Sequence, residues 1–214
     1  IKECKAFNLS IETHYFNPEN SKTFLAVNEI VLDLAPDAVL LAPLFYNEAL
    51  GVVEKYNKKE ILVNTFNNQV ESNEIRNFVG QDLHRSGRVA AKLMESISQK
   101  GQIAIIHIAE KFKNAIHMQE KEKGFRNYFV EKEDSIYEII SLKLKKTNYD
   151  TKLTDFLTEN PSLRGVFITT SKAYQIVEII NETVKNKISI IGYDLLDKNI
   201  TLLNQGKIDF LINQ

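Results

Sequence analysis

The chain has 214 residues, which is enough for one large domain or for two lobes of about 100 residues each. Its hydrophobic share of 43% and charged share of 26% are ordinary for a soluble globular protein. A net charge of −1 argues against a nucleic-acid-binding surface on these residues, because such surfaces are clearly basic. A single cysteine, Cys4, excludes a disulfide framework and a cysteine-held zinc ion. No apolar run approaches the roughly 18 residues of a membrane span, and no signal peptide is visible.

Short apolar runs alternate with amphipathic segments along the chain, which is typical of a parallel β-sheet whose strands are joined by helices. Some runs are continuously apolar, such as residues 103–106, and this suits strands that helices cover on both faces. The predicted strands are residues 9–16, 38–44, 60–66, 77–80, 102–109, 136–144, 164–170, 187–194 and 207–213.

Four sets of apolar residues follow helical spacing, and we expect them to face the core rather than a cofactor. The sets are Leu25, Val27, Ile30, Val31 and Leu34; Val89, Ala90, Leu93, Met94 and Ile97; Phe125 and Phe129; and Ile176, Val177, Ile179, Ile180 and Val184. Pro161 is expected to end a further helix that carries Leu153, Phe156 and Leu157. Residues 1–7 have the pattern of the end of a helix, so we expect a preceding strand to lie outside this chain.

Patterns that accompany catalysis or nucleotide binding are absent from the sequence. No two of the eight glycines are separated by a single residue, which excludes G-x-G-x-x-G, and neither G-x-x-x-x-G-K-[ST] nor G-x-S-x-G occurs. The four histidines form no H-x-x-x-H or H-x-H pair. We expect His107 to be a hydrogen-bonded core residue and His84 to be exposed or to cap a helix. The sequence therefore indicates no enzyme, metal site or cofactor, although a triad assembled across the fold stays open.

Four segments, taken in order, resemble the effector-binding core of the LacI family of bacterial repressors, which shares its fold with periplasmic sugar-binding proteins. The first segment is Phe78-Val79-Gly80-Gln81-Asp82 with Ser86-Gly87 and Ala90-Ala91, and the second is residues 120–126, which contain Gly124-Phe125-Arg126. The third is residues 165–171, which stand where the family has an apolar strand that ends in Asn-Asp. The fourth is Ile190-Ile191-Gly192-Tyr193-Asp194. Residues 210–214 resemble the strand that leads to the last hinge, so the ordered set covers nearly the whole chain.

The resemblance implies an α/β fold with two doubly wound parallel-sheet lobes, of the type I periplasmic-binding-protein kind. The first lobe would comprise residues 1–80 without its first strand, the second would comprise residues 81–213, and residue 214 would begin the hinge back. A sugar or sugar derivative would bind between the lobes and act as effector. The family's helix-turn-helix precedes this core, so operator DNA would be bound through a domain outside these residues. The resemblance also implies a cytoplasmic homodimer that is not an enzyme and needs no cofactor or membrane.

Ligands of open parallel sheets bind at the carboxyl ends of the strands, and polar residues follow the apolar runs here. The predicted ligand-binding residues are Asp194, Lys121, Asn67, Thr170, Ser171, Gln214, Phe45 and Asp82. Carboxylates accept hydrogen bonds from sugar hydroxyls, lysine donates them, amides do both, and an aromatic ring can cover a sugar ring. Lys121 stands where the resembled family usually has Arg, and Thr170-Ser171 replaces its Asn-Asp. The identity of the sugar therefore stays open.

Several of these residues have a plainer structural interpretation. Asp194 could cap the next helix, and Thr170 with Ser171 could cap the helix after residue 171. Lys121 could be one of several solvated charges in residues 120–123, and Asn67 could be a turn residue.

The functional interpretation also has a rival, a periplasmic solute-binding protein that serves a transporter or a sensor, which would have the same lobes. A helix-turn-helix encoded before Ile1 would indicate the repressor, whereas a signal peptide there would indicate the binding protein. An α/β enzyme is a weaker third possibility, since no catalytic constellation supports it.

Overall fold

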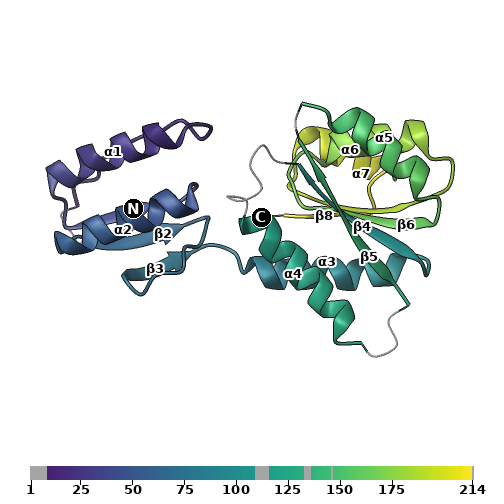
Figure 1. Ribbon diagram of the computed structural model, residues 1–214, viewed down its shortest axis with the longest axis horizontal. Helices are drawn as coiled ribbons and strands as arrows, with labels where there is room; N and C mark the ends of the chain where they lie inside the picture. Colours follow the sequence, from purple (N-terminus) through teal and green to yellow (C-terminus); the bar gives the residue numbers. More distant parts are fainter. Residues whose placement is uncertain (1–8, 109–115, 133–135, 146, 214) are drawn as a thin grey trace. The chain divides into compact units, whose positions relative to one another are not determined.

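The computed structural model describes residues 9–108, 116–132, 136–145 and 147–213. The chain divides into two compact units, which we call unit 1 (Ile1–Gly80) and unit 2 (Gln81–Gln214). Each unit has its own β-sheet, and the strand pairs described in both sheets are parallel. Strands alternate with helices along the chain (Figure 1), so the predicted α/β fold with parallel sheets is confirmed.

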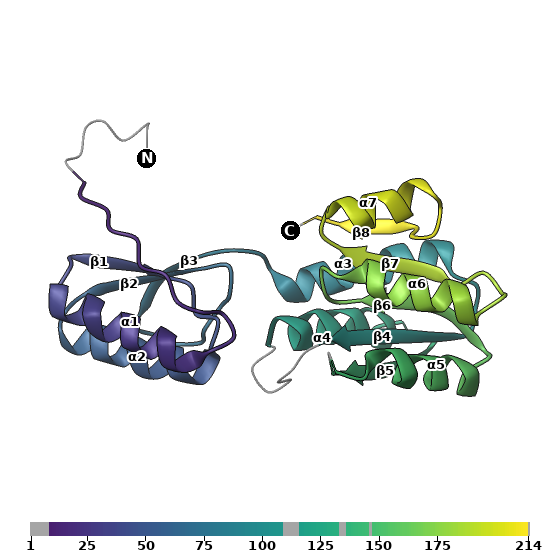
Figure 2. The ribbon, with the colours of Figure 1, turned by 90° about the horizontal axis from the view of Figure 1, so that it is seen from above.

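Unit 1 contains a sheet in the order β1-β2-β3, formed by β1 (Ala38–Leu41), β2 (Leu62–Phe66) and β3 (Ile75–Val79). Two helices, α1 (Ser21–Leu34) and α2 (Tyr46–Lys58), lie on the same face of this sheet (Figure 2).

Burial in β2 follows from that arrangement, because successive side chains of a strand point to opposite faces. Val63 and Thr65 are buried against the helices, whereas Leu62 and Phe66 are exposed on the other face. In the described residues of unit 1, helices therefore cover one face of the sheet only.

The predicted strand at residues 9–16 is wrong, because this segment has no regular secondary structure. Its apolar residues suggested a strand, but Leu9 is 61% exposed and Ile11 is 57% exposed. A strand needs backbone hydrogen bonds to a neighbour, and no strand in the described part of the chain pairs with this segment. The expectation for residues 1–7 concerns positions outside the described residues.

Unit 2 contains a five-stranded sheet in the order β5-β4-β6-β7-β8. Its strands are β4 (Gln102–Ile108), β5 (Glu138–Leu144), β6 (Leu163–Ile168), β7 (Ser189–Tyr193) and β8 (Phe210–Ile212). β4 lies in the interior of the sheet and is buried from Ile103 to Ile108, as its continuous apolar run predicts. β3 and β4 belong to different sheets, so the chain leaves one sheet before it enters the other.

Helices cover both faces of the sheet in unit 2 (Figures 1 and 2). One face carries α3 (Leu83–Ile97) and α4 (Ile116–Val130), and the other carries α5 (Tyr149–Glu159), α6 (Ala173–Thr183) and α7 (Asp197–Asn204). A separate hydrophobic cluster fills the space on each side. None of the helices in the described residues has the length and apolar character that crossing a lipid bilayer requires.

Two glycines let the backbones of α3 and α4 touch. A Cβ atom on Gly87 would lie 2.0 Å from the carbonyl oxygen of Lys121, and one on Gly124 would lie 1.9 Å from the carbonyl oxygen of His84. Both distances are far inside van der Waals contact, so only glycine fits at either position without a shift of the backbone. The crossing therefore fixes where α4 presents Lys121.

Candidate functional site

β6 and β7 are hydrogen-bonded neighbours that run in the same direction, so their carboxyl ends meet at one edge of the sheet. Thr170 and Ser171 follow the end of β6, and Asp194 follows the end of β7. This is the edge at which parallel sheets bind ligands. We call Lys121, Thr170, Ser171 and Asp194 the strand-end site, because contacts of Lys121 with β7 and with Thr169 join α4 to these two strand ends.

Lys121 is buried, with 3% of its surface exposed. Its Nζ lies 3.4 Å from the carbonyl oxygen of Thr169 and 3.6 Å from the centroid of the Tyr193 ring. Burial lowers the pKa of Lys121 to about 8, and the nearby carboxylate of Asp194 opposes this shift. The interpretation of Lys121 as a solvated charge is therefore wrong. The residue is largely charged at pH 7 and has more N–H donors than the Thr169 carbonyl can use.

Asp194 adopts a left-handed backbone conformation with φ of 65° at the end of β7. Burial raises the pKa of its carboxyl group, while the positive charge of Lys121 acts in the opposite direction. The next helix, α7, begins at Asp197, and its N-cap is Leu196 without a side-chain cap bond. The interpretation of Asp194 as a helix cap is therefore wrong, and its carboxylate lies within electrostatic range of Lys121.

Thr170 and Ser171 also do not cap a helix. The N-cap of α6 is Lys172, and the side chain of that residue makes no cap bond. The Oγ1 atom of Thr170 is buried and has no hydrogen-bond partner among the described residues, which is a costly state for a hydroxyl group. A ligand that hydrogen-bonds to this hydroxyl would remove that cost.

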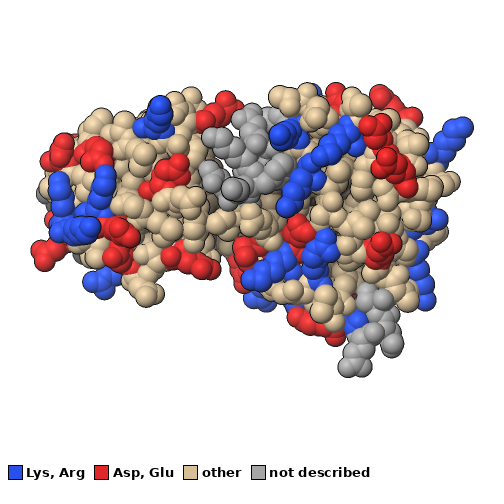
Figure 3. Space-filling view, viewed as in Figure 1, with Lys and Arg blue, Asp and Glu red and all other residues tan. Residues whose placement is uncertain are grey.

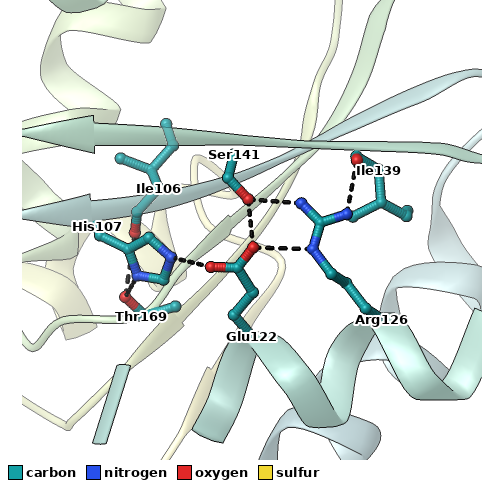
Figure 4. Close-up of polar contacts among 7 residues, drawn as sticks. All are labelled: Ile106, His107, Glu122, Arg126, Ile139, Ser141 and Thr169. Carbon is teal, nitrogen blue, oxygen red and sulfur yellow. Dashed lines mark hydrogen bonds and ion pairs between the residues drawn. The ribbon is translucent and has the colours of Figure 1, made fainter. Parts of the chain in front are cut away.

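A network of polar side chains joins β4, α4 and β5 to Thr169, the residue whose carbonyl group accepts from Lys121 (Figure 4). His107 Nδ1 lies 2.8 Å from Thr169 Oγ1, and His107 Nε2 lies 2.7 Å from a carboxylate oxygen of Glu122. The other oxygen of Glu122 accepts hydrogen bonds from Arg126 Nε and Ser141 Oγ. His107 is 2% exposed, so the prediction of a hydrogen-bonded core histidine is confirmed.

Glu122 is the charged centre of this network. Burial acts to raise its pKa, but hydrogen bonds from His107, Ser141 and Arg126 outweigh burial and lower the pKa to about 2. The carboxylate is therefore ionised at all ordinary pH values. It anchors α4 to β4 and β5, one residue after Lys121.

Sequence reasoning missed two residues that contact or influence the strand-end site. Burial, with help from the charge of Lys121, lowers the pKa of His117 to about 4, so this side chain is neutral at pH 7. His117 and Lys121 are four residues apart on α4, a spacing that places two side chains on one helix face. That spacing was the available signal. The second residue is Asn199 on α7, whose contacts are long-range and leave no local pattern.

Of the other predicted ligand-binding residues, Asp82 begins α3 in unit 2, Asn67 and Phe45 belong to unit 1, and Gln214 falls outside the described residues. Asp82 is the N-cap of α3 and accepts a hydrogen bond from the backbone N–H of Arg85 at 2.8 Å. Asn67, in unit 1, is exposed with φ of 66°, so the turn interpretation is confirmed. Phe45, also in unit 1, packs against Phe16 and Phe24.

His84 is neither freely exposed nor a cap, because its half-buried ring lies 3.0 Å from the side-chain nitrogen of Asn127. A cluster of three or more His, Cys, Asp or Glu residues that could hold a metal ion is not found in the described ranges.

Comparison with known proteins identifies the family. The family model described as a periplasmic binding protein domain matches residues 2–214. A solved structure from Bacteroides fragilis, assigned as a LacI transcriptional regulator, is similar over 100% of this chain and 75% of its own, with 28% identity and a TM-score of 0.85. No curated protein matches the sequence.

Solved structures of transport proteins share the same fold. The periplasmic component of an ABC-type sugar transport system from Hahella chejuensis matches 95% of this chain and 75% of its own, with 20% identity and a TM-score of 0.77. An ABC transporter solute-binding protein from Burkholderia graminis, in complex with D-arabinose, matches 88% of this chain and 67% of its own, with 15% identity and a TM-score of 0.72. The order of strands, the two units and the family match agree, and the chain belongs to the periplasmic binding protein domain family.

Proposed function

We propose that unit 2 binds a neutral sugar or sugar derivative at the strand-end site, and that the protein is a sugar-responsive transcription regulator of the LacI type. The observation that carries the first part is the buried ammonium group of Lys121. Thr169 O, at 3.4 Å, is its hydrogen-bond acceptor in the described residues, which leaves N–H groups for a ligand. Thr170 supplies a second unsatisfied group, because its buried hydroxyl has no partner in the described part of the chain.

The charges of the strand-end site favour a neutral ligand with several hydroxyl groups. Lys121 and Asp194 carry opposite charges and act on each other's pKa, so the pair is close to neutral as a whole. An anionic ligand would gain from Lys121 but would be repelled by Asp194. A sugar satisfies both, since its hydroxyls accept from the ammonium group and donate to the carboxylate. Neighbouring structures with bound D-arabinose support this chemistry.

The regulator interpretation rests on similarity and on the resembled motifs. The Bacteroides fragilis protein matches this chain at higher identity and over more of its length than the transport proteins described above. Acidic and basic side chains are interspersed over each unit on the face shown in Figure 3. We assign DNA contacts to a helix-turn-helix outside these residues, because the resembled family carries one there and because the net charge of this chain is −1. The regulator would be a cytoplasmic homodimer that binds sugar without converting it.

A solute-binding protein of a sugar transporter or sensor is the second candidate function. Several transport proteins share the fold, and this observation favours it. The two functions differ in what precedes Ile1 in the full-length protein. A helix-turn-helix and operator binding by the full-length dimer support the regulator, whereas a signal peptide supports the transport protein and contradicts the regulator.

Calorimetry tests the sugar site. D-arabinose, D-glucose and D-galactose are titrated into the protein, into Lys121→Met and into a matched control, Lys123→Met. Lys123 lies on the same helix, but its side chain is 64% exposed. We expect at least one sugar to bind to the wild type and to the control. The affinity of Lys121→Met for that sugar should be lower by about tenfold or more. Equal sugar affinity in all three proteins would contradict the site. If NMR showed that the protein converts the sugar to a product, a pure binding function would be contradicted.

A further inference from the structure

Asn199 has an unusual set of contacts for a residue outside the strand-end site. It lies in the first turn of α7 and is 0% exposed. Its Nδ2 lies 2.7 Å from the carbonyl oxygen of Ser171 and 3.0 Å from those of Tyr193 and Asp194, so the two N–H groups are shared among three acceptors. Its Oδ1 accepts from the backbone N–H of Tyr174 at 3.0 Å. One side chain therefore bonds to the loops that follow two different strands.

The contact with Tyr174 replaces a missing helix cap. Tyr174 is in the first turn of α6, where backbone N–H groups have no partner within the helix, and the N-cap of α6 makes no side-chain bond. Asn199 satisfies this group from α7. The start of α6, and with it Thr170 and Ser171, is thus held by a residue of the next βα repeat.

The contacts on the other side of Asn199 fix the turn that carries Asp194. Its amide holds the carbonyl groups of Tyr193 and Asp194, the two residues at which β7 ends and the backbone turns into a left-handed conformation. A left-handed conformation is uncommon for residues other than glycine, although Asp and Asn tolerate it better than most. The two carbonyl bonds stabilise the backbone at the residue whose carboxylate belongs to the strand-end site.

We propose that Asn199 is a positioning residue that holds Thr170–Ser171 and Asp194 at the separation the ligand requires. The inference rests on the proposed sugar site but names a residue that does not touch the ligand. Its affinity effect is indirect and arises because a loosened loop must be ordered again when the ligand binds.

Asn199→Ala removes all four hydrogen bonds without adding a buried charge, and hydrogen exchange reads the consequence in the ligand-free protein. We expect faster exchange of the Tyr174 amide and of residues 194–198, by about tenfold or more, because each lost bond opens a path to solvent. Unchanged exchange in both loops would overturn the proposal. This readout needs no ligand, so it tests whether Asn199 holds the two loops even if the proposed sugar function fails.

The second readout is sugar affinity. It is measured with whichever of D-arabinose, D-glucose and D-galactose the wild type binds best. We expect about tenfold weaker binding in Asn199→Ala at a temperature where the variant stays folded. The matched control is Asn28→Ala in unit 1. Asn28 is 4% exposed, donates to Phe24 O and accepts from the Tyr56 hydroxyl, so its loss destabilises the protein without touching the site loops. Equal losses of affinity in the two variants would overturn the proposal.

Asn199→Asp separates positioning from a merely structural role through its pH profile. The introduced carboxylate, when ionised, would present only acceptors to three carbonyl oxygens, whereas the protonated carboxyl group could donate to one of them. We therefore compare the sugar affinity of this variant with that of the wild type at the same pH. The ratio of the two affinities should rise as the pH is lowered from 8 to 5. A ratio that does not change with pH while the folded state persists would count against positioning. Failure of the wild type to bind any sugar would instead refute the proposed function.

Discussion

The Nζ atom of Lys121 lies 3.6 Å from the centroid of the Tyr193 ring, so an aromatic face holds this buried ammonium group. A desolvated cation over a ring of this kind gains about 2 kcal/mol, which offsets part of the loss of hydration. The ring is itself fixed, because the Tyr193 hydroxyl lies 2.8 Å from Ser86 Oγ. Burial raises the pKa of Tyr193, so the ring stays uncharged while it holds the cation.

Stability should rise with pH above 8 because of Lys121. The folded protein holds its pKa near 8 against an ordinary value of 10.5, so between these values the unfolded chain binds more protons than the folded one. The full shift corresponds to about 3 kcal/mol. Urea unfolding of the wild type and of Lys121→Met from pH 7 to pH 10 should show a wild-type gain that the variant lacks. A constant difference between the two proteins across this range would contradict the buried lysine.

Sugar affinity should have the opposite pH dependence. A sugar that accepts hydrogen bonds from a charged ammonium group favours the protonated form of Lys121, so affinity should fall as pH rises through about 8. Calorimetry from pH 6.5 to pH 9.5 measures the trend, with Lys121→Arg as control because arginine keeps its charge. If the sugar affinity of the wild type did not change with pH while the protein remained folded, the assignment of Lys121 to the site would be wrong.

Asp194→Asn should weaken sugar binding about ten- to a hundredfold, because a hydrogen bond to a charged group contributes roughly 1.5–3 kcal/mol. The melting temperature should change little, since Asp194 is not the cap of α7. Asparagine also tolerates the left-handed backbone at this position, where φ is 65°. Calorimetry beside a melting curve distinguishes loss of a ligand contact from loss of structure, and unchanged affinity would defeat the assignment.

Glu122→Gln should destabilise the protein near neutral pH, but not at pH 2. The folded-state pKa of Glu122 is about 2 against an ordinary 4.5, so its stabilisation of about 3 kcal/mol is present above pH 4.5 and is lost as pH falls toward 2. The control is Glu131→Gln, whose exposed pair with Arg88 should matter little. Denaturant unfolding at several pH values gives the comparison. A wild-type advantage that persists at pH 2 would mean that packing, not charge, is responsible.

Gly87→Ala and Gly124→Ala should each destabilise the protein by more than about 2 kcal/mol, because a new Cβ would overlap a backbone carbonyl of the partner helix. Gly51→Ala is the matched control. It lies in α2 with no atom within 4 Å of its Cβ position, so alanine should stabilise that helix by about 0.5–1 kcal/mol. Thermal or denaturant unfolding of the three variants tests the contrast. Similar effects at all three glycines would mean that α3 and α4 are not in backbone contact.

The sheets and helices could be predicted because their signals are local. Continuous apolar runs such as residues 103–106 and the helical stripe that contains Ala90 and Met94 appear within one element, and both have the predicted structure. Residues 9–16 show the limit of that method, because a strand depends on a partner that its own pattern does not reveal.

The chemistry of the site depended on contacts between distant parts of the chain. Lys121 is flanked by Glu120, Glu122 and Lys123, a run that indicates solvent, yet the glycine crossing with α3 places it in the interior. Asn199 bonds to residues 171, 174, 193 and 194, and no pattern in its own helix announces these partners.

The crossing at Gly87 connects Lys121 to the start of unit 2 through direct contact between two helix backbones. α3 begins just after the boundary between the two units, and Gly87, in its second turn, lies against the carbonyl of Lys121. The two backbones touch without an intervening side chain, so Lys121 is separated by one stiff contact from the helix that begins after the unit boundary. We therefore expect a displacement of Lys121 to move the start of α3 with it, because no side-chain rearrangement between the two backbones can absorb the displacement.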